Sequence, residues 1–123
     1  MHTKQLITAG KKPEDASRVL IMIHGRGGSA EDILAVSDYL EVKDFALLAP
    51  QATGHSWYPY SFLAIPSQNE PWLSSALDLL NDIVNDIVSK GINKENIYFL
   101  GFSQGACLTL EFVARHEIGR AHV

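Results

Sequence analysis

Residues 97–105 read IYFLGFSQG, an apolar run that passes directly into the pattern G-x-S-x-G. Four apolar residues followed at once by glycine predict a buried strand that ends in a sharp turn at Ser103. The residues after the pattern, to about Arg115, favour a helix with one apolar face. Gly101 and Gly105 would let neighbouring backbone pass close to such a turn. The stretch therefore predicts a strand, a tight turn that presents the Ser103 hydroxyl, and a helix.

Two interpretations of this turn stay open on these residues. In one, Ser103 is the N-cap of an ordinary strand-to-helix connection. In the other, Ser103 is the nucleophile of a hydrolytic enzyme, because amide groups at the helix N-terminus beneath it can stabilise an oxyanion. The direct join of apolar strand, motif and apolar-faced helix favours the nucleophile.

The rest of the chain alternates between short apolar runs and helical patterns. Ser29, with Asp32 three residues on, predicts the start of a helix, and Gly91 predicts the end of a longer one. We expect strands at 19–23, 45–49 and 97–100, a weaker edge strand at 5–8, and helices over about 30–40, 73–90 and 104–115. This order predicts the α/β class, with a mostly parallel central sheet flanked by helices.

The glycine-rich segment 24–28, HGRGG, follows the predicted strand 19–23. An enzyme with a serine elbow takes its second oxyanion donor from a loop in this position. We therefore predict an oxyanion hole made by the backbone N–H groups of Arg26 and Gln104, with the Arg26 side chain pointing toward an acidic substrate group or a surface carboxylate. His24 precedes the glycines, so we expect it to support the loop by hydrogen bonds rather than to act as the base. The other supporting residues are Gly25, Gly27, Gly28, Gly101 and Gly105.

The same glycines also fit a dinucleotide-binding pattern, because residues 25–30 satisfy G-x-G-x-x-G/A after a strand. That pattern needs an acidic residue about 20 positions on to hold a ribose. The next predicted strand ends at Pro50 and Gln51 with no carboxylate. The nucleotide reading also leaves the turn at Ser103 unexplained, so it is the weaker alternative.

Composition limits the other classes of function. The 123 residues suit one domain, and a net charge of −4 without a basic patch argues against nucleic-acid binding. No apolar run reaches the roughly 20 residues that span a bilayer, and no signal peptide is recognisable. A single cysteine, Cys107, excludes an internal disulfide and fits a reducing compartment, so we expect a cytoplasmic protein.

Residues 50–68 predict a long loop that is rich in aromatic side chains. Its aromatic side chains either line a substrate pocket or pack the loop down, and His55 either contacts substrate or lies on the surface. Cys107, one turn into the last helix, is expected to be a buried small side chain rather than a second nucleophile. The candidates for substrate binding are His55, Trp57, Tyr58 and Phe62, with Tyr60 beside them.

Four motifs together resemble the phospholipase/carboxylesterase family, which includes acyl-protein thioesterases and small bacterial carboxylesterases. They are residues 24–28 (HGRGG), 50–52 (PQA), 57–58 (WY) and 101–106 (GFSQGA). The resemblance runs from about Leu20 to Arg115. It implies an α/β-hydrolase fold and a metal-independent, cofactor-free serine hydrolase that acts on small-molecule esters or thioesters through an acyl-enzyme on Ser103. It also implies an acyl pocket beside residues 57–62, a leucine in most relatives where Arg26 stands, and a homodimer in some members.

In the α/β-hydrolase order, the catalytic acid and base both follow the nucleophile, and only 20 residues follow Ser103. The last seven residues, EIGRAHV, back-translate into a common sequencing-adapter oligonucleotide. We therefore expect residues 1–116 to be a partial α/β-hydrolase domain and residues 117–123 a non-native tail, so His122 carries no role. The fragment is expected to be inactive and marginally stable, with strand 97–100 as an exposed edge.

Two further alternatives stay open. The chain could belong to another α/β-hydrolase, such as a feruloyl-type esterase or a dienelactone hydrolase, although the latter uses cysteine where this chain has Ser103. It could also be a non-catalytic binding domain that kept the fold and lost the triad.

Overall fold

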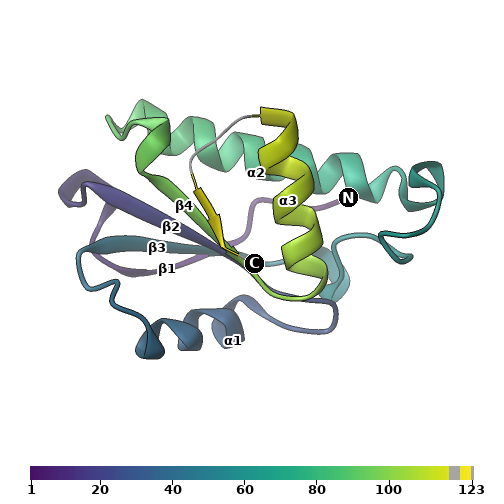
Figure 1. The fold of residues 1–123 in the computed structure, drawn as a ribbon, viewed down its shortest axis with the longest axis horizontal. Coiled ribbons are helices and arrows are strands. Elements are labelled where there is room, and N and C mark those ends of the chain that lie inside the picture. Colours follow the sequence, from purple (N-terminus) through teal and green to yellow (C-terminus); the bar gives the residue numbers. More distant parts are fainter. Residues whose placement is uncertain (117–119, 123) are drawn as a thin grey trace.

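The computed structural model describes residues 1–116 and 120–122, which form a sheet with helices on both faces (Figure 1). The sheet order is β1-β3-β2-β4-β5, with β1 antiparallel to β3 and the other pairs parallel. The strands are β1 (Leu6–Gly10), β2 (Arg18–Ile23), β3 (Phe45–Pro50), β4 (Ile97–Gly101) and β5 (Arg120–His122). The helices are α1 (Ala30–Ala35), α2 (Trp72–Ser89) and α3 (Gln104–His116). The predicted α/β class with a mostly parallel sheet is confirmed.

Five single-turn 3₁₀ segments connect these elements. They are η1 (Pro13–Asp15), η2 (Val36–Tyr39), η3 (Thr53–His55), η4 (Pro66–Asn69) and η5 (Lys94–Asn96). The η2 segment replaces the second half of the helix expected over about 30–40. Val36, Ser37 and Asp38 disfavour the helix interior, since a β-branched side chain and two backbone-competing ones follow one another. The helix start is as predicted, because the Ser29 side chain accepts a hydrogen bond from the Asp32 amide.

Side chains of β2 alternate between two cores because successive residues of a strand point to opposite faces. Val19, Ile21 and Ile23 join the core beneath α2 and α3, whereas Leu20 and Met22 join the core beneath α1. Figure 1 shows this arrangement, with α1 on one face of the sheet and α2 and α3 on the other. All five of these side chains are buried, as expected for a central parallel strand.

The longest helix, α2, has the extent that its apolar spacing predicts. Most of its apolar side chains lie in the core, with Val88 exposed near its end, and Gly91 follows its C-cap with φ 96°, in the left-handed region. None of the helices among residues 1–116 has the length and apolar character needed to cross a membrane.

The strand expected to be an exposed edge is covered over part of its length. Residues Tyr98, Phe99 and Leu100 of β4 pair in parallel with Arg120, Ala121 and His122 of β5. The prediction of an open edge at 97–100 is therefore wrong over these three residues. The main chain of β5 pairs with that of β4, and a main chain can do this whatever side chains it carries. The composition of residues 120–122 therefore did not predict the pairing.

Candidate active site

Ser103 lies at the turn between β4 and α3, and its backbone has φ 56°. A non-glycine residue in this left-handed region carries a strain of roughly 1–2 kcal/mol. The Phe102 amide donates to the Ile23 carbonyl (3.1 Å), and the Ala106 amide donates to the Ser103 carbonyl (2.9 Å). These bonds hold the turn in its strained form and leave the Ser103 side chain exposed at the carboxyl edge of β2 and β4.

The glycines around Ser103 are required by close backbone contacts. A Cβ on Gly105 would lie 2.2 Å from the Ile23 carbonyl oxygen, and one on Gly101 would lie 2.5 Å from the Gly105 carbonyl oxygen. Because the obstructing atoms are backbone, neither position has room for a side chain. The helix α3 can therefore start directly against β2, which places its N-terminus under Ser103.

The glycine loop 24–28 lies directly beside this turn. A Cβ on Gly25 would be 3.2 Å from the Ser103 Cβ and 3.0 Å from the Phe102 carbonyl oxygen. The Gly27 amide is already bonded to the His55 carbonyl (2.7 Å). Within the described residues, by contrast, the backbone N–H groups of Arg26 and Gln104 donate to no other protein group. Both amides are thus free to bind an anionic oxygen near Ser103.

The Arg26 side chain does not point to a carboxylate, so that part of the sequence prediction is wrong. Its guanidinium donates to the Ser56 hydroxyl (2.9 Å) and to the carbonyls of Pro59 (3.1 Å) and Tyr60 (2.9 Å). Arginine carries several donors in a fixed planar fork, which suits the binding of several acceptors in one loop. Arg26 therefore ties the aromatic-rich loop of residues 50–68, called the aromatic loop below, to the glycine loop.

The Gln104 side chain has a structural role that the sequence did not indicate. Its Oε1 accepts from the Trp57 amide (2.8 Å), and its Nε2 donates to the Tyr58 carbonyl (2.9 Å). The side chain is buried. Since a backbone amide can only donate, the bond from Trp57 also fixes the orientation of the Gln104 amide group.

His24 is buried beneath the glycine loop and hydrogen-bonded through both ring nitrogens. Its Nε2 accepts from the Ala52 amide (3.0 Å), so its Nδ1 carries the proton and donates to the Gly25 carbonyl (2.7 Å). Gln51 belongs to the PQA motif, but the sequence indicated no role for it. Its side chain lies 3.3 Å from the same Nε2 and accepts from the Ala30 amide at the start of α1 (2.8 Å). Burial lowers the pKa of His24, in keeping with a neutral supporting side chain.

His2, near the N-terminus, is also hydrogen-bonded through both ring nitrogens, in its case to the loop of residues 50–68. Its Nδ1 accepts from the Thr53 amide (3.1 Å), its Nε2 donates to the Trp57 carbonyl (2.7 Å), and burial lowers its pKa. A histidine whose pKa is lower in the folded chain than its ordinary 6.5 binds its proton more readily when unfolded. The stability that depends on neutral His2 and His24 is thus present above pH 6.5 and declines below it.

We expect the thermal midpoint of unfolding to fall when the pH is lowered from about 7.5 to about 5.5. The variant His2→Gln, which can still accept from Thr53 but cannot titrate, should show a smaller fall over the same range. Circular dichroism melts of both proteins at several pH values measure this. A midpoint that is constant or rises on acidification would contradict the expectation.

The four residues expected to bind substrate differ in burial and in their contacts. Trp57 is completely buried, and its indole N–H donates to the His24 carbonyl (2.8 Å). It has no surface for a substrate, so its assignment to substrate contact is wrong. His55 binds the Gly28 carbonyl through Nδ1 (2.7 Å) and so supports the glycine loop. Tyr58 and Phe62 reach a cavity, and burial raises the pKa of the Tyr58 hydroxyl to about 12.

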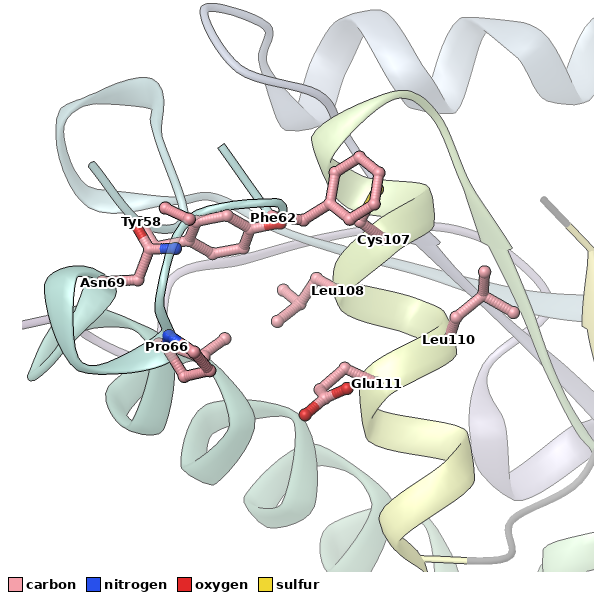
Figure 2. Close-up of a pocket in the computed structure, with 10 residues that line it drawn as sticks. Tyr58, Phe62, Pro66, Asn69, Cys107, Leu108, Leu110 and Glu111 are labelled. Atoms are coloured by element: carbon pink, nitrogen blue, oxygen red, sulfur yellow. The ribbon is translucent and has the colours of Figure 1, made fainter. Parts of the chain in front are cut away.

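This cavity has a volume of about 300 Å³ and lies between the aromatic loop, the start of α2 and α3. Figure 2 shows Tyr58 and Asn69 on the loop side and Leu108 and Glu111 on the side of α3. Cys107 is partly exposed in its wall, one turn after Ser103, so the thiol is not the buried side chain that we expected. The lining is mostly apolar and consists of Tyr58, Phe62, Ala64, Pro66, Asn69, Leu73, Cys107, Leu108, Leu110 and Glu111.

Within residues 1–116, no side chain hydrogen-bonds to the Ser103 hydroxyl. The same part of the chain holds no cluster of three His, Cys, Asp or Glu side chains that could bind a metal ion. The site therefore consists of an exposed serine, two free amides and an adjacent apolar cavity.

A mostly parallel sheet with a strained serine turn between a central strand and a helix, faced by a glycine loop, is typical of the α/β-hydrolase fold. The model of the phospholipase/carboxylesterase family matches residues 2–118, and the chain belongs to this family. The resemblance drawn from the four motifs is thereby confirmed.

Relatives of known sequence and structure agree with this assignment. The chain is 27% identical over 121 residues to acyl-protein thioesterase 1 of Kluyveromyces lactis, covering 85% of this chain and 53% of that protein. It is 29% identical over 115 residues to a probable SOBER1-like carboxylesterase of Arabidopsis thaliana, covering 80% and 44%. The crystal structure of a phospholipase/carboxylesterase from Dyadobacter fermentans superposes with a TM-score of 0.91 at 52% identity, covering 93% of this chain and 55% of that one. The chain thus spans about half the length of the relatives that it matches.

Proposed function

We propose that this chain carries the nucleophile and oxyanion hole of a serine hydrolase that cleaves carboxylic esters or thioesters. The observation that carries the proposal is the exposed Ser103 in a left-handed turn, beside the two free amides of Arg26 and Gln104. An ordinary N-cap serine does not require the left-handed backbone, since N-cap residues usually have extended φ and ψ. Ser29 in this chain is an example, with φ −143° and ψ 161°.

The reaction follows from the placement of these groups. The Ser103 Oγ attacks the carbonyl carbon, and the carbonyl oxygen takes up the negative charge and accepts hydrogen bonds from the Arg26 and Gln104 amides. When the intermediate collapses, the bond from the carbonyl carbon to the leaving oxygen or sulfur breaks. The alcohol or thiol leaves with the proton that the Ser103 hydroxyl gave up, and the acyl group stays on Ser103. Water then attacks the acyl-enzyme by the same route and releases the carboxylic acid.

The cavity beside α3 supports an assignment for the acyl group of the substrate. Its wall is mostly apolar, and Tyr58 and Phe62 lie on the side of the aromatic loop. Phe62 is 62% exposed, so its ring is available to cover a bound chain. We propose that Tyr58 and Phe62 contact the acyl chain, while His55 and His24 hold the loops in place.

Ser103 needs a general base to remove its proton, and none is bonded to it within residues 1–116. We therefore propose that the 123-residue chain alone has little activity. In the family, the acid and base follow the serine in chain order. A chimera can supply them by joining residues 1–116 to the part of the Dyadobacter fermentans relative that follows its matched region. This protein is called the completed chimera below.

We expect the completed chimera to hydrolyse p-nitrophenyl esters at least about 10³-fold faster than the 123-residue chain under the same conditions. The reason is that the base converts a weakly nucleophilic hydroxyl into an effective one. Initial rates with acetate, butyrate and octanoate esters measure this and give the preferred acyl length. A folded chimera with no turnover above the fragment would favour the non-catalytic binding domain instead.

A further inference from the structure

The Ser56 hydroxyl is the one protein group, among the described residues, that both Arg26 and Gln104 contact through their side chains. We propose that Ser56 is a positioning residue, which sets the spacing between the two amides of the oxyanion hole. This inference rests on the proposed function. It concerns a residue whose hydroxyl is bonded to other protein groups.

The hydrogen bonds of Ser56 use its full capacity. Its Oγ accepts from Arg26 Nη1 at 2.9 Å and from Gln104 Nε2 at 3.4 Å, and it donates to the Tyr58 carbonyl at 2.8 Å. A hydroxyl has one donor and two acceptor lone pairs, so these three bonds satisfy it completely. The bonds leave no freedom for the hydroxyl to rotate toward another partner.

The two oxyanion residues are otherwise held by separate parts of the aromatic loop. Arg26 binds the carbonyls of Pro59 and Tyr60, whereas Gln104 binds the backbone of Trp57 and Tyr58. Each side chain thus fixes its own backbone amide relative to the loop. Ser56 joins the two sets of bonds into one network.

Oxyanion donors must lie about 2.7–3.1 Å from the position of the developing charge, and small displacements reduce the rate strongly. Loss of the Ser56 hydroxyl removes the shared partner and lets the two amides move independently. Acylation and deacylation both pass through an oxyanion, so both steps should slow together. The expected consequence is a lower kcat with little change in KM.

The test uses Ser56→Ala and Ser56→Thr in the completed chimera with p-nitrophenyl butyrate. We expect Ser56→Ala to lower kcat about 10-fold while KM stays within about two-fold. Threonine keeps the hydroxyl, and the extended backbone of Ser56 (φ −144°, ψ 134°) accepts a β-branched side chain. Ser56→Thr should therefore retain kcat within about three-fold. Ser67→Ala is the matched control, because Ser67 is exposed and its hydroxyl makes no hydrogen bond among the described residues.

A second measurement is independent of turnover and uses the 123-residue chain as it is. The ¹H–¹⁵N NMR resonances of the Arg26 and Gln104 amides should shift in Ser56→Ala and stay in place in Ser67→Ala, because both amides donate to no other protein group among the described residues and their chemical shifts report their position. A parent chimera that turns over normally, with Ser56→Ala equally active and both amides unchanged, overturns the role of Ser56 and leaves the proposed function intact. A fall in both kcat and KM that threonine does not rescue also overturns it, since that pattern indicates a disturbed pocket. A folded parent without turnover overturns the proposed function, and with it the role of Ser56.

Discussion

Gly105→Ala should abolish cooperative folding of the completed chimera. The added Cβ would lie 2.2 Å from the Ile23 carbonyl oxygen and 2.5 Å from that of His24. Both are backbone atoms of the central strand β2 and the residue after it, so α3 would have to move away from the sheet. Overpacking of this kind costs more than about 3 kcal/mol where no side chain can move aside, a large part of the 5–15 kcal/mol that holds a domain folded. Urea unfolding followed by tryptophan fluorescence measures the loss.

Gly91→Ala is the matched control for this experiment. Gly91 has φ 96°, but a Cβ there meets nothing within 4 Å. Its replacement should cost about 1–2 kcal/mol from backbone strain alone and leave a cooperative transition. Equal stability of the two variants would show that the contact between α3 and β2 is not as close as the structure places it.

Ser103→Ala should lower ester hydrolysis by the completed chimera by about 10⁴-fold or more, without loss of the fold. No hydrogen bond of the Ser103 side chain supports the structure among residues 1–116, and alanine tolerates φ 56° about as well as serine. The residual rate would come from the oxyanion hole and substrate binding. Steady-state rates with p-nitrophenyl butyrate, beside circular dichroism spectra, measure both parts of this prediction.

Cys107→Ala is the control that separates the two nucleophilic side chains of this region. Cys107 lies in the cavity wall and is not the attacking group in our account, so its loss should change kcat by less than about three-fold. If Ser103→Ala retained more than about a hundredth of the parent rate while Cys107→Ala lost activity, the roles of the two residues would be reversed.

The main chain around the site was predictable because patterns of neighbouring residues in the sequence determine it. An apolar run, a glycine-flanked serine and an apolar-faced helix follow one another without a gap, so β4, the turn and α3 could be predicted from residues 97–115. The glycine loop was predictable for the same reason, since its place after β2 is a matter of order along the chain. The α1 helix was predicted too long, because three weak helix formers after Ala35 end it in a 3₁₀ turn.

The side-chain network was not predictable, because its partners are far apart in sequence. The hydrogen-bond partners of Arg26 come from a loop about 30 residues away, and those of Gln104 lie almost 50 residues before it. Nothing near Arg26 in the sequence distinguishes a bound guanidinium from one that faces solvent. Trp57 was wrongly assigned to the substrate because an aromatic residue in a loop looks the same whether it lines a pocket or fills the core. Only the packing of His2 and His24 against its ring decides that question.

The central claim is that Ser103 is the nucleophile, and covalent labelling tests it most directly. The completed chimera is treated with a fluorophosphonate, digested and analysed by mass spectrometry, with Ser103→Ala as the control. Our account predicts one adduct, on the peptide that contains Ser103, and no adduct in the variant. A folded chimera that stays unlabelled, or that carries its adduct on another residue, would contradict the account.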